Sequence, residues 1–564
     1  MPELSVNRKS VGKLFSEMQN KKFIIPDFQR PYSWDVEKCE ILWQDIINFL
    51  ETEENTQADY FLGTIVSNKD ENENNEIIDG QQRITTLSLI LRAFYYKLEQ
   101  MPQNDKNVVG LMNKVAPCIW NVDEISNEIT DRESIHIESF VATDDDNQVF
   151  HTILKTGEIT KEAEDNYSMN YAYFLKVCSE YAEKNPVNWE KLCVTILNKC
   201  IILPIECSSQ ETALTIFTTL NDRGMPLDDS DIFKAQIYRK MKTKEARAEF
   251  TEQWKELSNT CAAGVNLNIN DIFRYYTHVI RARNGMGASE KEIGLRRFYA
   301  ENKYERLNDE KIMSEVMRLA NFWYYLNKRD EPENEEGYTI SLESRKYIDC
   351  LFYYPNEYWK YVASVYFMKN NDKTDFEKGF CSILKKVTTF MFAKFITTPT
   401  VNAVKPDVFN ACVSIEKGQN FWNDIKFTIT SNNFYSSVRI TRSLLLLHAY
   451  LNPQQVGIIP YDCHIEHILP KKWQAANYNG WDKEQAQEWL ENFGNRVVFE
   501  KKLNIQAGNG YFGRKKERYA QSNIADIKDL ANYASNDFTV DDIKNRENEF
   551  ISRLTNFFVE QGVC

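Results

Sequence analysis

The segment DCHIEHILP near the C-terminus holds two of the chain's six histidines, His464 and His467, with Glu466 between them. Asn495 and Asn504 follow at the starts of two later segments. A neutral imidazole can take a proton from water, and an amide oxygen can hold the ring in its working orientation. Carboxylate and amide oxygens suit a hard ion such as Mg²⁺. These residue types together are what metal-assisted hydrolysis of a phosphodiester requires.

The spacing of these residues excludes one common metal motif. It reads H-x-E-H, which differs from the helical H-E-x-x-H of zinc proteases. The apolar neighbours favour a strand, whose twisted end can bring Glu466 and His467 around one site. His464 is then a supporting or hydrogen-bonded residue. A structural zinc site from Cys463, His464 and His467 stays an alternative, although the sequence shows no fourth ligand.

The same region is locally basic, because residues 464–520 hold ten Lys or Arg against seven Asp or Glu. Its helical segment YFGRKKERY interleaves basic and aromatic residues, which suits salt-sensitive contacts with phosphates. A basic exposed helix is more often simply solvated, so the pattern carries weight only beside the histidine and asparagine set. The candidate DNA contacts are Lys471, Lys472, Arg514, Lys515, Lys516 and Arg518.

A second group of reactive residues lies in IIDGQQRITT, where Asp79, Gly80, Gln81, Gln82 and Arg83 join a short strand to a helix. Such a turn presents backbone N–H groups and the positive end of a helix dipole to an anion. Arginine adds bidentate pairing with a phosphate. The chemistry is that of a phosphate cradle, although Asp-Gly is also an ordinary turn.

Alternating short strands and helices must position this cradle. FIIPDFQRPYSW is predicted to be extended, because Pro26 and Pro31 exclude a helix. FLGTIV and EIID read as strands that flank the polar segment 70–76, a plausible hairpin. Apolar residues at helical spacing follow GQQR, and Asp35 stands as an N-cap before another helix.

The rest of the chain is mostly helical by pattern. Residues 100–215 contain one buried strand, CIILPIEC, and NDRGMPLDDSDIFKA then forms a turn and a new helix with Asp228 and Ser230 as capping candidates. Residues 240–430 are aromatic-rich helices, whose aromatic stripes are more typical of a core than of base stacking. His136, His151, His278 and His448 are read as structural. Leu-rich and basic helices surround the strands DCHIEHILP and RVVFE.

Composition sets limits on the whole molecule. The chain has 564 residues, which favours roughly two to four domains. A net charge of −14 makes any DNA contact local. Twelve scattered cysteines without a CxxC pair fit buried thiols in a reducing cytosol. No apolar run reaches the length of a membrane span and no leader is evident, so a cytoplasmic address is expected.

The C-terminal motifs EHILP, GN and N resemble the HNH (ββα-metal) nuclease fold, and more narrowly the nuclease half of GmrSD-type restriction proteins. This resemblance implies that His467 is the general base and that Asn495 orients it. It implies that Glu466 and Asn504 lie on the metal side, with Mg²⁺ or Mn²⁺ as the ion. Lys471 stands where the family often has Gln, a departure that touches no proposed ligand.

The N-terminal motifs FIIPDFQRPYSW, DGQQR and FTTLNDRGMPLDDSDIFKA occur in the order that resembles the N-terminal half of GmrSD-type proteins. That half resembles the ParB/sulfiredoxin nucleotide-binding fold, and the match covers most of residues 15–240. No P-loop motif is present. By resemblance, the following residues contact or approach a nucleoside triphosphate: Gln29, Arg30, Asp79, Gly80, Gln81, Gln82, Arg83, Asn221 and Arg223.

These observations predict an α+β, multidomain protein. By resemblance, residues 1–240 form a ParB/sulfiredoxin-like α/β domain that binds and hydrolyses a nucleotide, and residues 431–564 form an HNH nuclease domain. Residues 241–430 are expected to form a helical connecting domain. By resemblance the chain is a nucleotide-regulated, metal-dependent DNA endonuclease of antiphage restriction type, directed at modified phage DNA. The alternative is a nucleotide-switched DNA-binding protein that keeps an inactive HNH scaffold.

Overall fold

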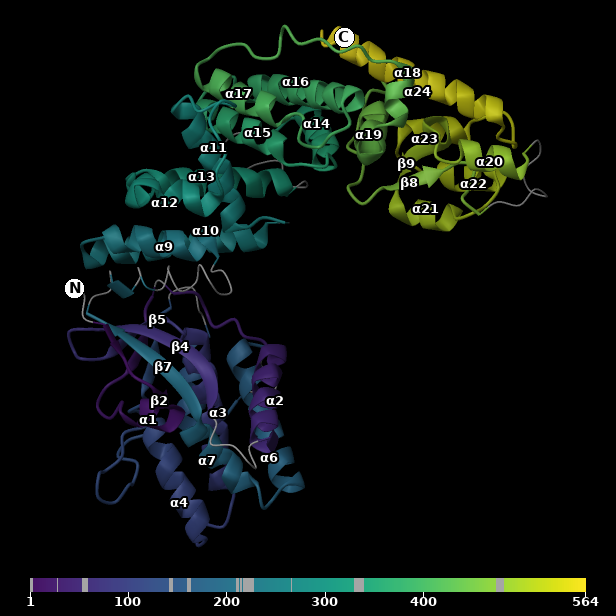
Figure 1. Cartoon of the computed structure of the whole chain (residues 1–564). Coiled ribbons are helices and arrows are strands. Elements are labelled where there is room, and N and C mark those ends of the chain that lie inside the picture. The colour runs from purple at the N-terminus through teal and green to yellow at the C-terminus, as the bar shows by residue number, and fades with distance from the viewer. Residues whose placement is uncertain are drawn as a thin grey trace. The chain divides into compact units, whose positions relative to one another are not determined.

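A computed structural model describes most of the chain, which divides into two compact units (Figure 1). The described residues are 4–27, 29–52, 59–141, 146–159, 164–208, 212–213, 216, 228–264, 266–328, 339–472 and 481–564. The first unit is Met1–Asn259 with Tyr299–Met313, and the second is Thr260–Phe298 with Ser314–Cys564. The predicted α+β, multidomain class is confirmed, whereas the domain limits at 240 and 430 stay predictions.

The first unit is built on one mixed sheet with the strand order β1-β7-β4-β5-β3-β6, and β2 pairs with β7. β4 runs parallel to β7 and antiparallel to β5, while β3 runs parallel to both β5 and β6. The strands are β1 (Leu4–Val6), β2 (Lys9–Ser10), β3 (Phe23–Ile25), β4 (Tyr60–Lys69), β5 (Asn75–Asp79), β6 (Ile137–Ser139) and β7 (Cys200–Cys207).

Helices of this unit lie between the strands and after the last strand. They are α1 (Val11–Ser16), α2 (Val36–Thr52), α3 (Gln81–Glu99), α4 (Lys106–Val115), the short η2 (Ala116–Cys118), α5 (Asn147–Thr156), α6 (Asn166–Lys184), α7 (Trp189–Lys199) and α9 (Asp229–Lys240). The predicted strands FLGTIV, EIID and CIILPIEC are confirmed as parts of β4, β5 and β7. The predicted hairpin is confirmed as well, since the N–H of Asp70 donates to the carbonyl of Asn74 at its tip.

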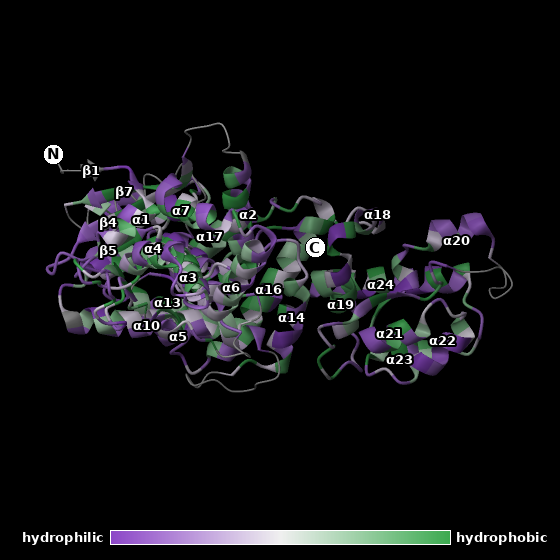
Figure 2. Cartoon of the chain, turned by 90° about the horizontal axis from the view of Figure 1, so that it is seen from below, coloured by the Kyte–Doolittle hydropathy of each residue, from purple (hydrophilic) through white to green (hydrophobic). Residues whose placement is uncertain are grey.

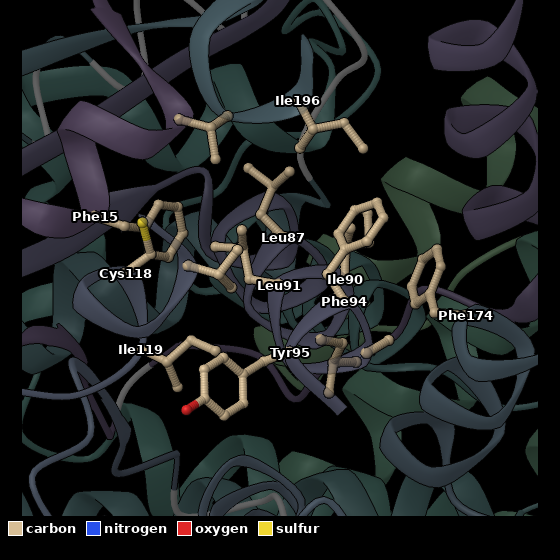
Figure 3. Close-up of a cluster of buried hydrophobic side chains, with 14 of the residues drawn as sticks. Phe15, Leu87, Ile90, Leu91, Phe94, Tyr95, Cys118, Ile119, Phe174 and Ile196 are labelled. Atoms are coloured by element: carbon tan, nitrogen blue, oxygen red, sulfur yellow. The ribbon is translucent and has the colours of Figure 1, made fainter. Parts of the chain in front are cut away.

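Helix α3 is the centre of the core, because nearly every residue on it is buried. Figure 3 shows Leu87, Ile90, Leu91 and Phe94 of α3 among side chains from other helices. Those partners include Phe15, Cys118, Phe174 and Ile196, all fully or almost fully buried. Burial of this size fixes the direction of α3, and therefore fixes the turn at its N-terminus.

The next part of the chain is helical, as predicted. Its helices are α10 (Lys244–Ala263), α11 (Ile269–Arg283), α12 (Leu295–Tyr304), η3 (Glu305–Asn308), α13 (Ile312–Asn327), α14 (Leu342–Phe352), α15 (Tyr358–Asn370), α16 (Phe376–Thr397), α17 (Lys405–Glu416), α18 (Ser431–Tyr435), η4 (Val438–Ile440) and α19 (Thr441–Tyr450). Phe322 stacks on Phe367 with ring centroids 4.0 Å apart, and His278 stacks on Tyr361. The aromatic stripes are therefore core.

The C-terminal segment carries a two-stranded sheet and short helices. These elements are β8 (His464–His467), α20 (Lys483–Trp489), η6 (Phe493–Asn495), β9 (Arg496–Phe499), α21 (Lys501–Ala507), α22 (Phe512–Tyr519), α23 (Ala525–Ala531) and α24 (Val540–Glu560). In Figure 2, α20 and α22 are largely hydrophilic. Across the described residues, no helix is both long enough and apolar enough to cross a membrane.

Candidate active site

The strands β8 and β9 and the helix α21 follow one another around the predicted histidine site. β8 pairs with β9 in antiparallel register, with Glu466 opposite Val497 and His467 opposite Arg496. α21 begins just after β9 and carries Asn504, which is half-buried. The predicted strands are confirmed. The strand–strand–helix order brings the two later segments next to β8.

Asn495 is fully enclosed and is bonded to the backbone near His467. Its Oδ1 accepts from the N–H of Leu469 at 2.7 Å, and its Nδ2 donates to the carbonyls of Leu469 at 3.1 Å and Leu490 at 2.8 Å. Both backbone groups of Leu469 thus depend on one side chain. Asn495 therefore orients the chain segment that follows His467, rather than bonding to the imidazole ring.

The His467 ring contacts a carboxylate that sequence reasoning missed. Its Nε2 lies 3.2 Å from Oε1 of Glu491, and Oε2 of Glu491 lies 3.3 Å from Nη1 of Arg496. Burial lowers the pKa of His467, and the carboxylate of Glu491 opposes this shift. Glu491 lies in the segment ENFGN with no motif of its own, so only the folded chain reveals the pair.

Glu466 is 3% exposed and is held by helix α22. Its Oε1 accepts from Nζ of Lys515 and from the hydroxyl of Tyr519, both at 2.7 Å. The ammonium of Lys515 also donates to the carbonyls of His467 at 2.6 Å and Ile468 at 3.3 Å. The expectation that Lys515 contacts DNA therefore needs correction, because its side chain is 0% exposed and surrounded by protein acceptors.

The other predicted DNA contacts differ in how far their side chains are exposed to solvent. Lys471 and Arg514 have side chains that are 62% and 72% exposed, and Lys472 is exposed. Arg518 is half-buried. The ammonium of Lys516 donates to the carbonyls of Tyr533 and Ser535, which holds it against the protein. The exposed residues are the ones a phosphate could reach without rearrangement.

The predicted metal-side residues, Glu466 and Asn504, both carry oxygen donors. Oε1 of Glu466 accepts the hydrogen bonds from Lys515 and Tyr519, whereas Oε2 takes part in no hydrogen bond among the residues that the structure describes. Across the same described ranges, no three His, Cys, Asp or Glu side chains cluster as a metal site. The zinc alternative is therefore unsupported there. Carboxylate and amide oxygens are the ligands that Mg²⁺ and Mn²⁺ prefer.

The predicted phosphate cradle lies where β5 ends and α3 begins. Gly80 is the N-cap of α3 with a φ of 93°, and a Cβ there would lie 2.8 Å from the side chain of Ile65. Only glycine fits this turn. The first N–H groups of α3 have no acceptor within a helix, so the turn offers donors to an anion.

Arg83 lies near Asp79, and its guanidinium occupies space that a second glycine, Gly63, leaves open. Its Nη1 donates to the carbonyl of Thr64 at 2.8 Å. Gly63 has a φ of +115°, and a Cβ there would lie 2.9 Å from the guanidinium carbon. Burial raises the pKa of Asp79, and Arg83 and Arg30 oppose this shift. Gly63 was not selected from the sequence, although a glycine inside a strand signals close approach.

The two glutamines of the motif face the protein. Nε2 of Gln81 donates to the carbonyl of Arg30 at 3.0 Å, and Oε1 of Gln82 accepts from the N–H groups of Ser33 and Trp34. Gln29 likewise donates to the carbonyl of Ile78. These amides join the segment after β3 to the end of β5 and the start of α3.

Helix α9 adds two charged residues that sequence reasoning missed. Nζ of Lys234 donates to the carbonyl of Gln29 at 3.3 Å, and burial lowers the pKa of Lys234 to about 8. Burial raises the pKa of Asp231, with Arg30 opposing. Their three-residue spacing in DDSDIFKA, on one face of a helix, was the available signal. The predicted Asn221 and Arg223 lie outside the described residues.

Two family models match the chain. GmrSD restriction endonuclease, N-terminal domain, matches residues 11–238, and GmrSD restriction endonucleases, C-terminal domain, matches residues 421–553. No curated protein matches. The two matches cover more than half of the chain and contain both candidate sites. They support a restriction nuclease with DNA as its substrate, and they confirm the resemblance read from the motifs: the chain belongs to the GmrSD restriction endonuclease family.

Proposed function

We propose that this protein is a metal-dependent DNA endonuclease of the HNH type that acts on modified phage DNA in the cytoplasm and is controlled by a nucleotide. The observation that carries this proposal is the pairing of Glu466 and His467 at adjacent positions of β8, with β9 alongside and α21 following. Asn495 and Lys515 hold the backbone of the same strand end. A carboxylate and an imidazole that are both fixed at one strand end suit hydrolysis.

His467 acts as the base in this proposal. Its Nε2 faces an acceptor, the carboxylate of Glu491, so that nitrogen carries the proton. The Nδ1 lone pair is then available to accept a proton from water. Glu491 thus selects the tautomer and holds the ring, as a carboxylate does in other histidine pairs.

The metal-side residues are Glu466 and Asn504. Oε2 of Glu466 and the amide oxygen of Asn504 would hold Mg²⁺ or Mn²⁺. The bound ion would neutralise charge on the phosphate. Lys471, Lys472, Arg514 and Arg518 would contact the DNA backbone around this point, with an affinity that falls as salt rises.

The nucleotide would lie at the start of α3. The N–H groups of that turn, the guanidinium of Arg83 and the ammonium of Lys234 offer positive charge to its phosphates. Gln81 and Gln82 contribute by fixing the segment after β3, which carries Arg30. Asp79 and Asp231 balance these cations in the absence of phosphate.

The test is cleavage of modified and plain plasmid DNA, with Mg²⁺ or Mn²⁺ and with each nucleoside triphosphate in turn. Wild type should cut modified DNA only when metal is present, and its rate should respond to one nucleotide. Arg83→Ala should weaken nucleotide binding and remove that response. If Arg83→Ala changes neither property, the regulatory half of the proposal is wrong. DNA retention without cleavage under every condition would support the alternative, a binding protein with an inactive nuclease scaffold.

A further inference from the structure

We propose that Lys515 is a positioning residue of the nuclease site, which presents one oxygen of Glu466 to the metal and fixes the backbone under His467. This inference rests on the proposed function, because it gives Lys515 a role in that same site. It replaces the expected role of Lys515 as a contact to DNA. The evidence is the geometry of the lysine ammonium, the burial of both charges and the way the two carboxylate oxygens are used.

The three donor bonds of the Lys515 ammonium converge on one strand end. They reach Oε1 of Glu466 at 2.7 Å, the carbonyl of His467 at 2.6 Å and the carbonyl of Ile468 at 3.3 Å. A lysine ammonium has three donor hydrogens, so this set of acceptors uses them all. None of them remains for a DNA phosphate in this conformation.

The ion pair is sealed from water on the lysine side. The side chain of Lys515 is 0% exposed and that of Glu466 is 4% exposed. Buried ion pairs give little net stability compared with apolar residues of the same shape, but breaking one leaves an uncompensated charge. A pair of this kind is therefore poorly explained by stability alone. Its second effect is to fix the position of the carboxylate.

The two oxygens of the carboxylate have different surroundings. Tyr519, one helical turn after Lys515 on α22, donates its hydroxyl to the same Oε1 at 2.7 Å. Oε1 thus takes both donors, while Oε2 is left without a hydrogen bond within the described part of the chain. Two donors on one oxygen define the orientation of the carboxylate plane. A ligand that is oriented in advance by neighbouring hydrogen bonds binds a metal more tightly.

The proposal predicts that loss of Lys515 affects metal binding and DNA binding differently. Loss of Lys515 should release the Glu466 carboxylate and weaken metal binding. It should leave DNA affinity unchanged, since the ammonium is enclosed. A residue that contacts a phosphate behaves in the opposite way: its loss weakens DNA binding and lowers the salt slope by about one.

The experiment compares Lys515→Met and Tyr519→Phe with Lys516→Met as the matched control in full-length protein. Lys516 is the neighbouring lysine, and its ammonium contacts the carbonyls of Tyr533 and Ser535 instead. Mn²⁺ binding is measured by electron paramagnetic resonance, and metal-free DNA binding is measured across salt concentrations. We expect Mn²⁺ affinity to fall tenfold or more in Lys515→Met, to fall a few-fold in Tyr519→Phe, and to stay at the wild-type value in Lys516→Met.

Two results would overturn the proposal: unchanged Mn²⁺ affinity in Lys515→Met, or a reduced salt slope for DNA in that variant. If Lys515→Met does not fold, Tyr519→Phe decides, because it keeps both charges, and unchanged Mn²⁺ affinity there also overturns the proposal. Wild type that binds Mn²⁺ in the expected pattern but never cuts DNA would contradict the proposed function while leaving the positioning role intact.

Discussion

The two candidate sites differ in how their charged side chains are paired with other groups. In the C-terminal site, one oxygen of Glu466 is fixed by hydrogen bonds from Lys515 and Tyr519 before any ligand arrives. In the N-terminal cradle, Arg83 donates to a backbone carbonyl and only influences Asp79 through space. The first arrangement is typical of a site organised in advance, and the second of one that adjusts to an anion. Loss of Asn495 in the C-terminal site should therefore mainly lower stability, whereas changes around Arg83 in the cradle should mainly lower ligand affinity.

The largest expected effect on stability is at Asn495. Asn495→Ala removes three hydrogen bonds, which leaves the buried backbone groups of Leu469 and the half-buried carbonyl of Leu490 without this partner. Each such group costs about 1–3 kcal/mol, so we expect the free energy of unfolding to fall by about 3 kcal/mol. Asn504→Ala on α21 is the control and should change it by less than about 0.5 kcal/mol. Urea unfolding measures the free energy of unfolding of both variants. An equal loss in Asn495→Ala and Asn504→Ala would contradict a site that is organised in advance.

A smaller effect is expected at the cradle. Gly63→Ala places a Cβ 2.9 Å from the Arg83 guanidinium at a φ that disfavours any side chain. We expect nucleotide affinity to fall about tenfold, which corresponds to about 1.4 kcal/mol. Gly110→Ala in α4 is the control, because a Cβ there meets open space. Isothermal titration calorimetry measures the affinities, and wild-type affinity in Gly63→Ala would show that Arg83 does not bind the nucleotide.

The smallest expected change in nucleotide affinity is its dependence on pH. The pKa of Lys234 is about 8 in the folded protein and about 10.4 in an unfolded chain. Between these values the unfolded chain binds more protons, so this lysine makes the free energy of unfolding rise with pH. Nucleotide affinity should fall a few-fold above about pH 8, as the ammonium loses its charge.

Lys234→Met removes the titrating group and tests both effects. The variant should lose this part of the rise in stability and should bind nucleotide with a flatter pH profile. Urea unfolding and calorimetry at pH 7 to 10 measure the two quantities. Identical profiles in wild type and Lys234→Met would exclude Lys234 from the cradle.

Features that depend on residues close together in the chain could be predicted from the sequence. The strands β4, β5 and β7, the start of α3 and the adjacent pair Glu466 and His467 follow from local patterns of polarity and turns. The short strands β1, β2 and β6 were not predicted, because two or three residues carry no readable alternation.

What the sequence could not show was which polar side chains would bind the protein itself. Lys515 reads as one more basic residue of an exposed helix, yet it lies against Glu466, 49 residues earlier. Gln81 and Gln82 read as ligand contacts, yet their amides hold the segment after β3. Such pairings depend on tertiary packing between distant segments, which spacing along the chain does not encode.

The central claim is that His467 is the base of a nuclease, and one comparison tests it directly. Single-turnover cleavage of modified DNA is measured for His467→Ala and for His464→Ala, which changes the half-buried histidine at the other end of β8. We expect His467→Ala to lose about 10²–10⁴-fold in rate with unchanged DNA affinity, and His464→Ala to cut at close to the wild-type rate. Undiminished cleavage by His467→Ala would contradict the account.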